Sequence, residues 1–321
     1  MKIVVLALES FWDTGLAIVL DALKLADRFS AAQMGGTLRF DVSIVGVRKR
    51  IRSGQGFIIP VNTITPDLKP DWVIMPALST GRPDQLITRL GQRDIAPVKR
   101  QLRKWHEGGA RIAASCISAF VLAETGLLDH REVTTTWWLA PLFRQRYPNV
   151  LLDETRMLVA SDIGVTSGAA MGHLDLALWL IRQASPELSS VVSRYLLADL
   201  RTLQAAYIIP NHLAEADPLI ERFERWARDH LKDGFSLKEL AEALAVTPRT
   251  LQRRCEAVLG KSPLAYFQDL RVERAQSLLH GGHLDVDAIA AEVGYADATT
   301  LRTLLRERLG RGVRELRASL R

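Results

Sequence analysis

The sequence predicts two parts of different fold class, an α/β sandwich followed by an all-α domain. In the first part, continuous apolar runs such as 3–8 (IVVLAL) alternate with helical patterns, which is typical of a parallel sheet covered by helices. In the second part, the segment 251–271 recurs in altered form at 301–321, so one helical arrangement is built twice. A chain of 321 residues is long enough for two or three domains, each with its own core.

The elements of the first part alternate between strand and helix patterns along the chain. Strands are predicted at 3–8, 38–47, 71–76 and 110–115, and helices at 14–29, 84–90 and 96–107. Because connections between parallel strands are right-handed, this alternation predicts an α/β flavodoxin-like sandwich. The patterns GxGxxG and GxxxxGK[ST] are absent from it, so no nucleotide cofactor is expected.

The chain is mildly basic, with a formal net charge of +6 and a pI near 9.5. Residues 1–217 hold 24 Lys and Arg against 21 Asp and Glu, and residues 218–321 hold 18 against 15, so each part carries +3. Bulk charge therefore suits nucleic-acid binding but does not locate a site. The two cysteines, Cys116 and Cys255, are too few for a disulfide framework or a metal site and suit a reducing compartment.

Composition and apolar runs favour a globular protein over a membrane protein. Hydrophobic residues make up 48% of the chain and charged residues 24%, which is ordinary for a globular protein. The N-terminal apolar stretch is too short for a signal peptide and is interrupted by Glu9, and the longest apolar run, 112–123, is far short of a bilayer span. We therefore expect a cytoplasmic protein without a membrane partner.

A cysteine stands at a sharp turn between a strand and a helix. The segment 110–126 has the pattern of a strand, a turn at Ser115-Cys116-Ile117, and a helix that ends at Gly126. A nucleophile elbow places its nucleophile at such a turn, and the dipole at a helix N-terminus lowers the pKa of a thiol. The alternative is that Cys116 is a small buried residue packed at a strand end, as free cysteines often are.

A helix, a short turn and a second helix are predicted at 236–259. Ser236 and Glu239 form the pattern of a capping box before the first helix. Thr247 is placed to cap the second helix, and Pro248 at its first position costs no hydrogen bond. The segment therefore predicts a helix-turn-helix unit.

The second helix carries Arg249, Gln252 and Arg253 on the face opposite its apolar residues. Side chains of this kind, early on the second of two such helices, are suited to reading bases in the major groove of DNA. A second helix-turn-helix is predicted at 285–309, and one helix at 264–279 joins the two units. At 1.5 Å per residue the joining helix spans about 24 Å, which would set the two units about one turn of DNA apart.

The remaining stretches define the expected domain boundaries. An amphipathic helix at 218–231 is expected to pack beneath the first unit, whereas 198–217 lacks periodicity and is interrupted by Pro210. We therefore expect an effector-sensing and dimerisation domain at 1–197, a linker at 198–217, and a DNA-binding domain at 218–321.

Over residues 218–317, the spacing, caps, turns and repeat resemble the DNA-binding domain of the AraC/XylS family of transcription regulators. The resemblance implies base-reading positions at Arg249, Gln252 and Arg253 in the first unit and at Thr299, Arg302 and Thr303 in the second. It implies phosphate contacts from Thr250, Thr300 and Arg306. A merely solvated face is the simpler interpretation of Arg254, Arg308 and Arg311. Gly312-Val313 and Leu316 stand where the family has proline and an aromatic residue, which puts the packing of the C-terminal end in question.

Nearly all of residues 1–195 resemble the PfpI-like, class I amidotransferase-like domain. The resemblance rests on SCISAFVLAETGLLDHREVTTTWW, which starts at Ser115, and on TSGAAMGHLDLALWLI, which starts at Thr166. More narrowly, it is the version that precedes a helix-turn-helix in GlxA-type AraC-family regulators. The enzymes of that superfamily pair the elbow cysteine with a histidine at the position that is Thr136 in this chain.

Other positions also depart from the catalytic pattern. Ala114 and Ser118 stand where a G-x-C-x-G elbow has glycines. A cysteine is nucleophilic only as a thiolate, usually activated by an imidazole, and neither His130 nor His173 matches the motif position. The resemblance therefore implies a catalytically inactive domain, and we expect that the protein is not an enzyme.

The resemblance implies that the domain keeps a pocket at the C-terminal edge of its sheet for a small, nitrogenous metabolite. Residues expected around the pocket are Asp13, Ser115, Cys116, Ile117, Thr136, Trp137 and Ser167. Trp137 is suited to form an aromatic wall for a quaternary ammonium or guanidinium group, with Asp13 as counter-charge. Ordinary core packing is the alternative for Trp137.

The sequence therefore predicts a DNA-binding transcriptional regulator of the activator type. Its expected partners are double-stranded promoter DNA, a small-molecule effector, a second copy of the chain, and RNA polymerase. One alternative is a cysteine-dependent amidase or hydrolase with an appended DNA-binding domain, which Thr136 disfavours. Another is a redox sensor that uses Cys116, which would need a low thiol pKa.

Overall fold

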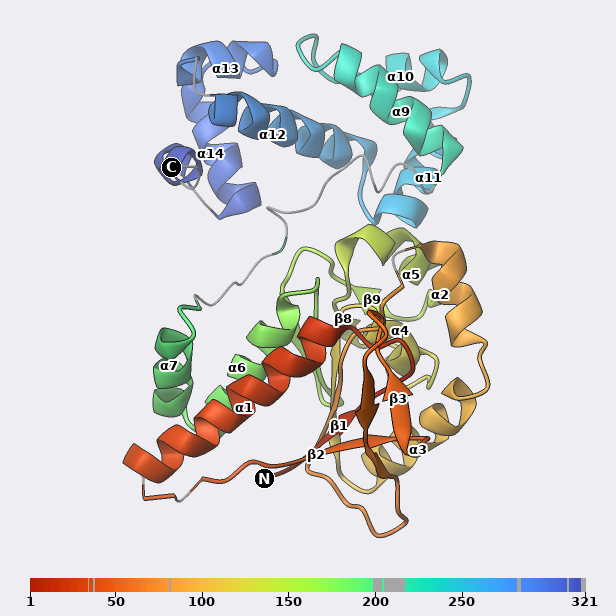
Figure 1. Cartoon of the computed structure of the whole chain (residues 1–321). Coiled ribbons are helices and arrows are strands. Elements are labelled where there is room, and N and C mark those ends of the chain that lie inside the picture. Colours follow the sequence, from red (N-terminus) through yellow and green to blue (C-terminus); the bar gives the residue numbers. More distant parts are fainter. Residues whose placement is uncertain are drawn as a thin grey trace. The chain divides into compact units, whose positions relative to one another are not determined.

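The computed structural model of the chain is shown in Figure 1. It describes residues 1–33, 35–36, 38–80, 82–198, 204, 217–281, 284–310 and 312–318. The chain divides into two compact parts. The first comprises Met1–Trp137 and Tyr147–Gln204, and the second comprises Trp138–Arg146 and the C-terminal part, described from residue 217 onward. Except for residues 198, 204 and 217, the predicted linker at 198–217 lies outside the described residues.

A seven-stranded sheet forms the centre of the first part of the chain. Its strand order is β10-β11-β7-β6-β1-β2-β5, and among the described strands of this sheet only β10 and β11 pair antiparallel. The strands are Lys2–Leu6 (β1), Asp41–Gly46 (β2), Asn62–Thr63 (β5), Trp72–Met75 (β6), Arg111–Ser115 (β7), Leu158–Ala160 (β10) and Gly164–Ser167 (β11). The succession β2-β1-β6-β7-β11 is the flavodoxin-like order, which confirms the predicted fold class.

Helices cover both faces of the sheet (Figure 1). One group consists of α1 (Asp13–Gln33), α6 (Gly172–Ala184) and α7 (Pro186–Tyr195), and the other of α2 (Pro83–Leu90), α3 (Ile95–Glu107) and α4 (Ser118–Ala123). Ile3 and Val5 of β1 belong to the core shared with α1, while Val4, which points to the opposite face, is equally buried. Burial on both faces explains why β1 is continuously apolar instead of alternating.

Smaller elements complete the first half of the chain. An antiparallel hairpin is formed by β3 (Arg50–Arg52) and β4 (Ile58–Pro60), and a short parallel pair by β8 (Glu132–Val133) and β9 (Leu151–Leu152). The 3-10 turn Trp137–Leu139 leads into α5 (Ala140–Arg146). The hairpin was not predicted, because its strands are too short to show a clear periodicity.

The second part of the chain is helical. Its helices are α9 (Pro218–Asp229), α10 (Leu237–Ala243), α11 (Pro248–Leu259), α12 (Pro263–Gly281), α13 (Val286–Glu292), α14 (Ala298–Leu309) and α15 (Val313–Ala318). The predicted helix-turn-helix pairs are α10–α11 and α13–α14, joined by α12, which confirms the all-α double helix-turn-helix fold. With 19 residues α12 is about 28 Å long, and α11 and α14 lie toward its two ends (Figure 1).

The C-terminal end packs well although it lacks the proline and the aromatic residue of the family pattern. Leu316 of α15 is 3% exposed and belongs to the core built by α12, α13 and α14. Its backbone N donates to Gly312 O at 3.0 Å, and Gly312 N donates to a carboxylate oxygen of Glu315 at 2.7 Å. Leucine therefore fills the position that an aromatic residue has in the repeat, where Tyr266 is fully buried.

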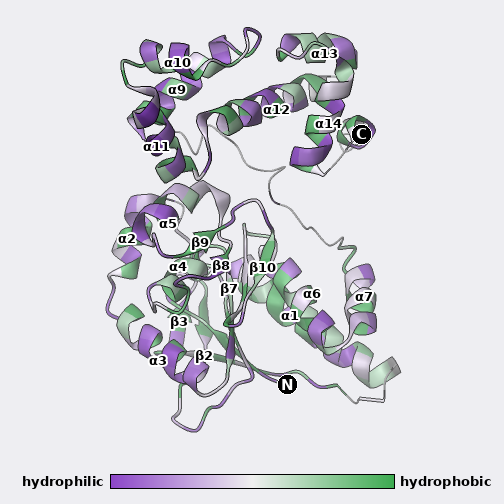
Figure 2. Cartoon of the chain, turned by 180° about the vertical axis from the view of Figure 1, so that it is seen from behind, coloured by the Kyte–Doolittle hydropathy of each residue, from purple (hydrophilic) through white to green (hydrophobic). Residues whose placement is uncertain are grey.

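Hydropathy follows this division into cores and surfaces. Figure 2 shows hydrophobic residues on the strands and on the helix faces turned toward them, whereas α3 and α11 are largely hydrophilic. Among the described residues, no helix combines the length and the apolar character needed to cross a lipid bilayer.

Candidate functional site

The first helix-turn-helix is built by local hydrogen bonds. Its turn passes through Ala245, which has a left-handed backbone (φ 56°), and Val246 N donates to Ala241 O at 3.0 Å. Thr247 caps α11 as predicted, because its hydroxyl oxygen accepts a hydrogen bond from Thr250 N at 3.1 Å. The cap fixes the start of α11 and with it the direction in which the first helical residues point.

The polar residues of α11 lie on its exposed side. The buried side consists of Leu251, Cys255 and Leu259. Arg249 and Arg253 are exposed, and Gln252 is half-buried, with its amide nitrogen donating to Glu256 Oε1 at 2.5 Å. Two guanidinium groups and one amide therefore stand on one side of α11 near its start.

The second helix-turn-helix repeats this construction. Gly294 takes the left-handed position of the turn (φ 80°), and Tyr295 N donates to Ala290 O at 2.8 Å. Asp297 caps α14, accepting a hydrogen bond from Thr300 N at 2.8 Å. This hydrogen bond is the main cause that lowers the pKa of the Asp297 carboxyl.

The exposed side of α14 carries hydroxyls and guanidinium groups. Exposed are Thr299, Thr300, Arg302, Thr303 and Arg306, whereas Leu301, Leu305 and Leu309 are buried. The Thr303 hydroxyl donates to Thr299 O at 3.1 Å, and the Thr300 hydroxyl donates to Asp297 at 3.0 Å. The hydrogens of these two hydroxyls are engaged in the helix, so their oxygens face solvent as acceptors.

Two arginines that the sequence assigned to a solvated face form ion pairs with carboxylates elsewhere in the chain. Arg254 Nε donates to Asp217 Oδ2 at 2.5 Å, and Asp217 is the cap of α9. Arg308 pairs at 3.0 Å with Asp269 of α12, which also pairs at 3.0 Å with Lys261. The side chains of Arg254 and Arg308 are 55% and 37% exposed, but each also pairs with a carboxylate, 37 and 39 positions away in the sequence.

The cations of the predicted DNA-contacting faces differ from these. Among the described residues, no ion pair involves the guanidinium groups of Arg249, Arg253, Arg302 or Arg306. Arg311, the third arginine of the solvated-face prediction, lies outside the described residues. Guanidinium groups that the fold leaves unpaired are available to an external polyanion.

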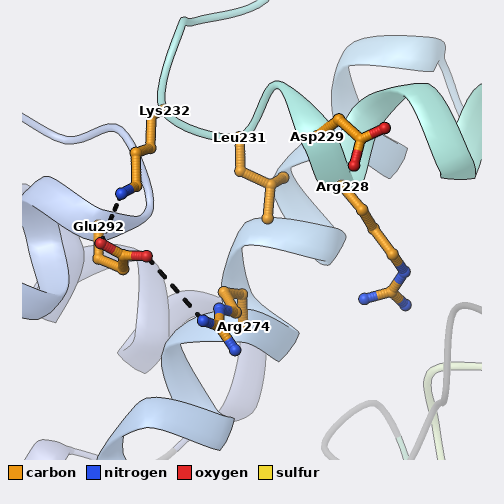
Figure 3. Close-up of a pocket in the computed structure, with 6 residues that line it drawn as sticks. All are labelled: Arg228, Asp229, Leu231, Lys232, Arg274 and Glu292. Atoms are coloured by element: carbon orange, nitrogen blue, oxygen red, sulfur yellow. Dashed lines mark ion pairs between the residues drawn. The ribbon is translucent and has the colours of Figure 1, made fainter.

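A pocket of about 300 Å³ between α9, α12 and α13 shows the opposite situation (Figure 3). Lys232 and Arg274 converge on Glu292, with nitrogen–oxygen distances of 2.7 and 3.9 Å. Arg228, also at the pocket, pairs with Glu273 at 2.7 Å. Its cations are neutralised by the protein, so this pocket belongs to the framework of the domain.

The cysteine elbow has the predicted backbone geometry. Cys116 follows directly after β7 in a left-handed conformation (φ 54°), and its backbone N donates to Ser167 O at 2.7 Å. The hydroxyls of Ser115 and Ser167 are 2.8 Å apart. These bonds join the ends of β7 and β11 at the C-terminal edge of the sheet.

The thiol of Cys116 lacks the properties of a nucleophile. It is 3% exposed, and burial raises its pKa to about 12, which outweighs the helix N-terminus expected to lower it. The fully buried Thr136 hydroxyl favours the thiolate slightly, although it makes no hydrogen bond of ordinary geometry among the described residues. The structure therefore supports the alternative of a buried, unreactive cysteine.

The two candidate histidines differ in their surroundings, and His173 is not available as a base. His173 is fully buried, its Nε2 accepts a hydrogen bond from Ala77 N at 2.9 Å, and its Nδ1 lies 2.5 Å from Ala170 O. Burial lowers its pKa to about 4, so the ring is neutral with both nitrogens occupied. His130 is exposed, on the loop after α4.

The predicted pocket residues gather at the C-terminal edge of the sheet, and most of them are buried. Ser115, Cys116, Ile117, Thr136, Trp137 and Ser167 are each at most 7% exposed. Asp13 starts α1, and its carboxylate accepts a hydrogen bond from Gln55 N at 3.1 Å, in the turn of the β3–β4 hairpin. An effector contact of any of these residues remains a prediction.

Sequence reasoning missed three residues beside the elbow. Thr135 donates its hydroxyl to Cys116 O at 2.8 Å, and Thr134 N donates to Thr166 Oγ1 at 2.8 Å. Gln204 is fully buried against this segment. Nothing in the sequence could have placed Gln204 here, because it lies in a stretch without periodicity and its partner Thr134 is 70 positions away.

Comparison with known proteins agrees with the two-part construction. A family model described as a helix-turn-helix domain matches residues 240–319. The transcriptional regulator CdhR of Pseudomonas aeruginosa is 30% identical over 63% of this chain and 62% of its own length, and the regulator GlxA of Rhizobium meliloti is 28% identical over 63% and 64%. The chain therefore spans about three fifths of the length of these curated relatives.

A solved structure gives the fold of the first part. It is that of a Vibrio parahaemolyticus protein described as a candidate transcriptional regulator, with a TM-score of 0.51, 18% identity, and coverage of 61% of this chain and 98% of that one. The fold and the two repeated units define a protein with a flavodoxin-like α/β part and a double helix-turn-helix part. The helix-turn-helix match at residues 240–319 and the likeness to GlxA and CdhR make the chain similar to helix-turn-helix transcriptional regulators.

Proposed function

We propose that the protein is a sequence-specific DNA-binding transcriptional regulator. The observation that carries the proposal is the contrast between two groups of cations in the helical second part of the chain. Framework cations such as Arg254, Lys261 and Arg308 are paired with carboxylates. Four other guanidinium groups of α11 and α14 have no ion-pair partner among the described residues: those of Arg249, Arg253, Arg302 and Arg306. A phosphate backbone and guanine edges are the ligands that such groups bind in a helix-turn-helix.

The two helices are suited to read DNA in different ways. Arg249 and Arg253 can each pair bidentately with guanine, and Gln252 with adenine once it exchanges its bond to Glu256 for the base. Thr250, Thr300 and Arg306 are proposed to contact phosphates. Joined by a helix of about 28 Å, α11 and α14 would contact major-groove segments separated by about one turn of DNA.

The α/β first part of the chain is proposed to sense a small nitrogenous metabolite and to hold two copies of the chain together. Its support is the flavodoxin-like sheet, whose C-terminal edge is the usual ligand position, together with Thr136 at the position where the enzymes that the domain resembles carry a histidine. Activation of transcription, with RNA polymerase as partner, is part of the same proposal. Thermal melting of the full chain with a panel of amines, amino acids and betaines tests the sensing; no shift with any compound would contradict it.

One observation favours a second candidate, a cysteine-dependent amidase. Cys116 keeps the left-handed backbone of a nucleophile elbow. Against this candidate stand the raised thiol pKa and the engaged nitrogens of His173. A Cys116→Ala variant decides between the two: it should regulate as the natural protein does, whereas loss of a measurable amidase activity on this change would favour the enzyme.

The DNA-binding proposal is tested by two arginine variants of the full chain. Arg253→Ala should lower affinity for a selected operator by about 5- to 150-fold, because a bidentate base contact is worth about 1–3 kcal/mol, and change binding to random DNA little. Arg225→Ala is the matched control, since Arg225 is equally charged but pairs with Glu221 on α9. Equal losses in both variants, or equal losses on operator and random DNA, would contradict the assignment of Arg253.

A further inference from the structure

A buried glutamine fills a space lined by three oxygens beside the elbow. The side chain of Gln204 is 0% exposed. Its amide nitrogen Nε2 lies 3.1 Å from Thr134 Oγ1, 2.9 Å from Thr135 O and 3.1 Å from Arg156 O. The backbone N of Gln204 donates to Thr155 O at 2.8 Å, which holds the residue at this position. Three oxygens therefore converge on one nitrogen in the interior of the α/β first part of the chain.

The orientation of the amide is fixed by its partners. Two of the three oxygens are backbone carbonyls, which only accept hydrogen bonds, so the amide nitrogen and not the amide oxygen must face them. The third, Thr134 Oγ1, donates its own hydrogen to Arg156 O at 2.9 Å and is left as an acceptor toward Gln204. The space is therefore built for a nitrogen that carries several hydrogens.

Glutamine fits this space incompletely. Its amide nitrogen has two hydrogens for three acceptors. In addition, no donor among the described residues reaches Gln204 Oε1, which is buried, and an unsatisfied buried carbonyl is unfavourable. A primary ammonium group has three N–H donors and no acceptor, so it would satisfy all three oxygens and leave none of its own polar atoms without a partner.

A glycine keeps the space open. A Cβ atom on Gly168 would lie 2.2 Å from Gln204 Nε2 and 2.4 Å from its Oε1. The backbone of Gly168 is not in the left-handed region, so it is the space beside it, and not its conformation, that excludes a side chain. An alanine here would clash with any group at the position of the nitrogen.

The space is connected to the elbow. Thr135, whose carbonyl accepts from Gln204, donates its hydroxyl to Cys116 O.

We propose that Thr134 Oγ1, Thr135 O and Arg156 O form the subsite for a primary ammonium group of the effector, and that Gln204 occupies this subsite when no effector is bound. The proposal names the chemical class of the ligand of the proposed sensor domain and rests on that function. Binding exchanges the glutamine amide for the ammonium group, with no covalent step.

Simple amine salts test the subsite on the full chain at neutral pH. Methylammonium chloride should raise Tm and bind in a titration, whereas tetramethylammonium chloride, which has no N–H, should do neither at the same concentration. Gln204→Ala should bind methylammonium about tenfold more tightly, because the competing occupant is gone. Gly168→Ala should not bind it. If Gln204→Ala does not fold, Thr134→Val, which removes one acceptor at constant shape, should weaken binding in its place.

Several results would overturn the proposal. These are equal effects of methylammonium and tetramethylammonium, unchanged binding in Gly168→Ala, or binding of acetamide without binding of methylammonium. DNA binding is measured on the same preparations. A chain that binds its operator but ignores methylammonium contradicts the subsite alone. A chain that binds methylammonium but has no preferred DNA sequence supports the subsite and contradicts the proposed function.

Discussion

The two helix-turn-helix units share one framework and differ in the chemistry of their exposed faces. In the repeat, Arg249, Gln252 and Arg253 of the first unit correspond to Thr299, Arg302 and Thr303 of the second. The first unit thus presents two guanidinium groups and an amide at the positions where the second presents one guanidinium and two hydroxyls. Bidentate groups discriminate between bases better than hydroxyls do, so we expect the first unit to supply most of the sequence specificity and the second most of the positioning.

The turns differ as well. The left-handed position is Ala245 in the first unit and Gly294 in the second. Ala245 is exposed, whereas a Cβ on Gly294 would lie 2.3 Å from Leu231 O and 2.4 Å from Arg271 Nη2. The first turn tolerates a side chain and the second does not, because Arg271 passes close to it to donate to Leu231 O at 2.7 Å.

The largest expected effect follows from this difference. Gly294→Ala should lower the free energy of unfolding of the helical second part of the chain by about 3 kcal/mol, since it combines backbone strain with displacement of a buried arginine. Ala245→Gly, the converse change in the first unit, should stabilise by at most about 1 kcal/mol, because relief of strain is offset by chain entropy. Urea unfolding measures both, and equal effects would show that the two turns are equivalent.

Next in size is the difference in base recognition. Arg249→Ala should cost about 2 kcal/mol in operator binding, with the loss confined to one base pair, whereas Thr299→Ala at the matching position should cost about 0.5 kcal/mol. Fluorescence anisotropy with operators that carry single base changes separates the two. A larger loss for Thr299→Ala would reverse the division of labour between the units.

A smaller effect is expected from Asp269, whose carboxylate pairs with Lys261 after the first helix-turn-helix and with Arg308 of the second. Asp269→Asn should weaken the ties from Lys261 and Arg308 to α12 and lower the free energy of unfolding by about 1 kcal/mol. It should also widen the range of spacings that the two units accept in DNA. Asp287→Asn is the control, because Asp287 is exposed and forms no ion pair among the described residues. Identical spacing preferences in both variants would mean that Asp269 does not fix the separation.

The smallest effect concerns the helix caps. The pKa of Asp297 lies below its ordinary value of 3.8, mainly because of the hydrogen bond from Thr300 N, so its stabilisation is present above pH 3.8 and is lost as pH falls through the lowered pKa. Thr247, the cap of the first unit, does not titrate. In an NMR titration the amide of Thr300 should therefore shift at low pH while that of Thr250 does not; a shared midpoint would contradict the distinction.

Features set by neighbours in the sequence were predictable. The cap Thr247 depends on residues within a few positions, and the repeat is visible in the sequence itself. The structure has both where the sequence predicts them. The α/β sandwich followed in the same way, from the alternation of apolar strand runs with helical patterns.

Features that depend on distant parts of the chain were not predictable. The pKa of Cys116 is set by what covers the thiol and not by the turn that carries it, so the local expectation of a lowered value failed. Arg254 finds Asp217 and Gln204 finds Thr134 across 37 and 70 positions. Single charged or amide side chains in polar stretches give no periodic signal from which such pairs could be read.

Selection of binding sites from random DNA by the full chain tests the central claim most directly. If both units read DNA, and do so unequally, the selected sites should contain two blocks about 10 base pairs apart, one strongly restricted and one weakly restricted. Arg249→Ala should relax the strong block, and Arg302→Ala the weak one. A single block, or two blocks that both survive either substitution, would contradict the account.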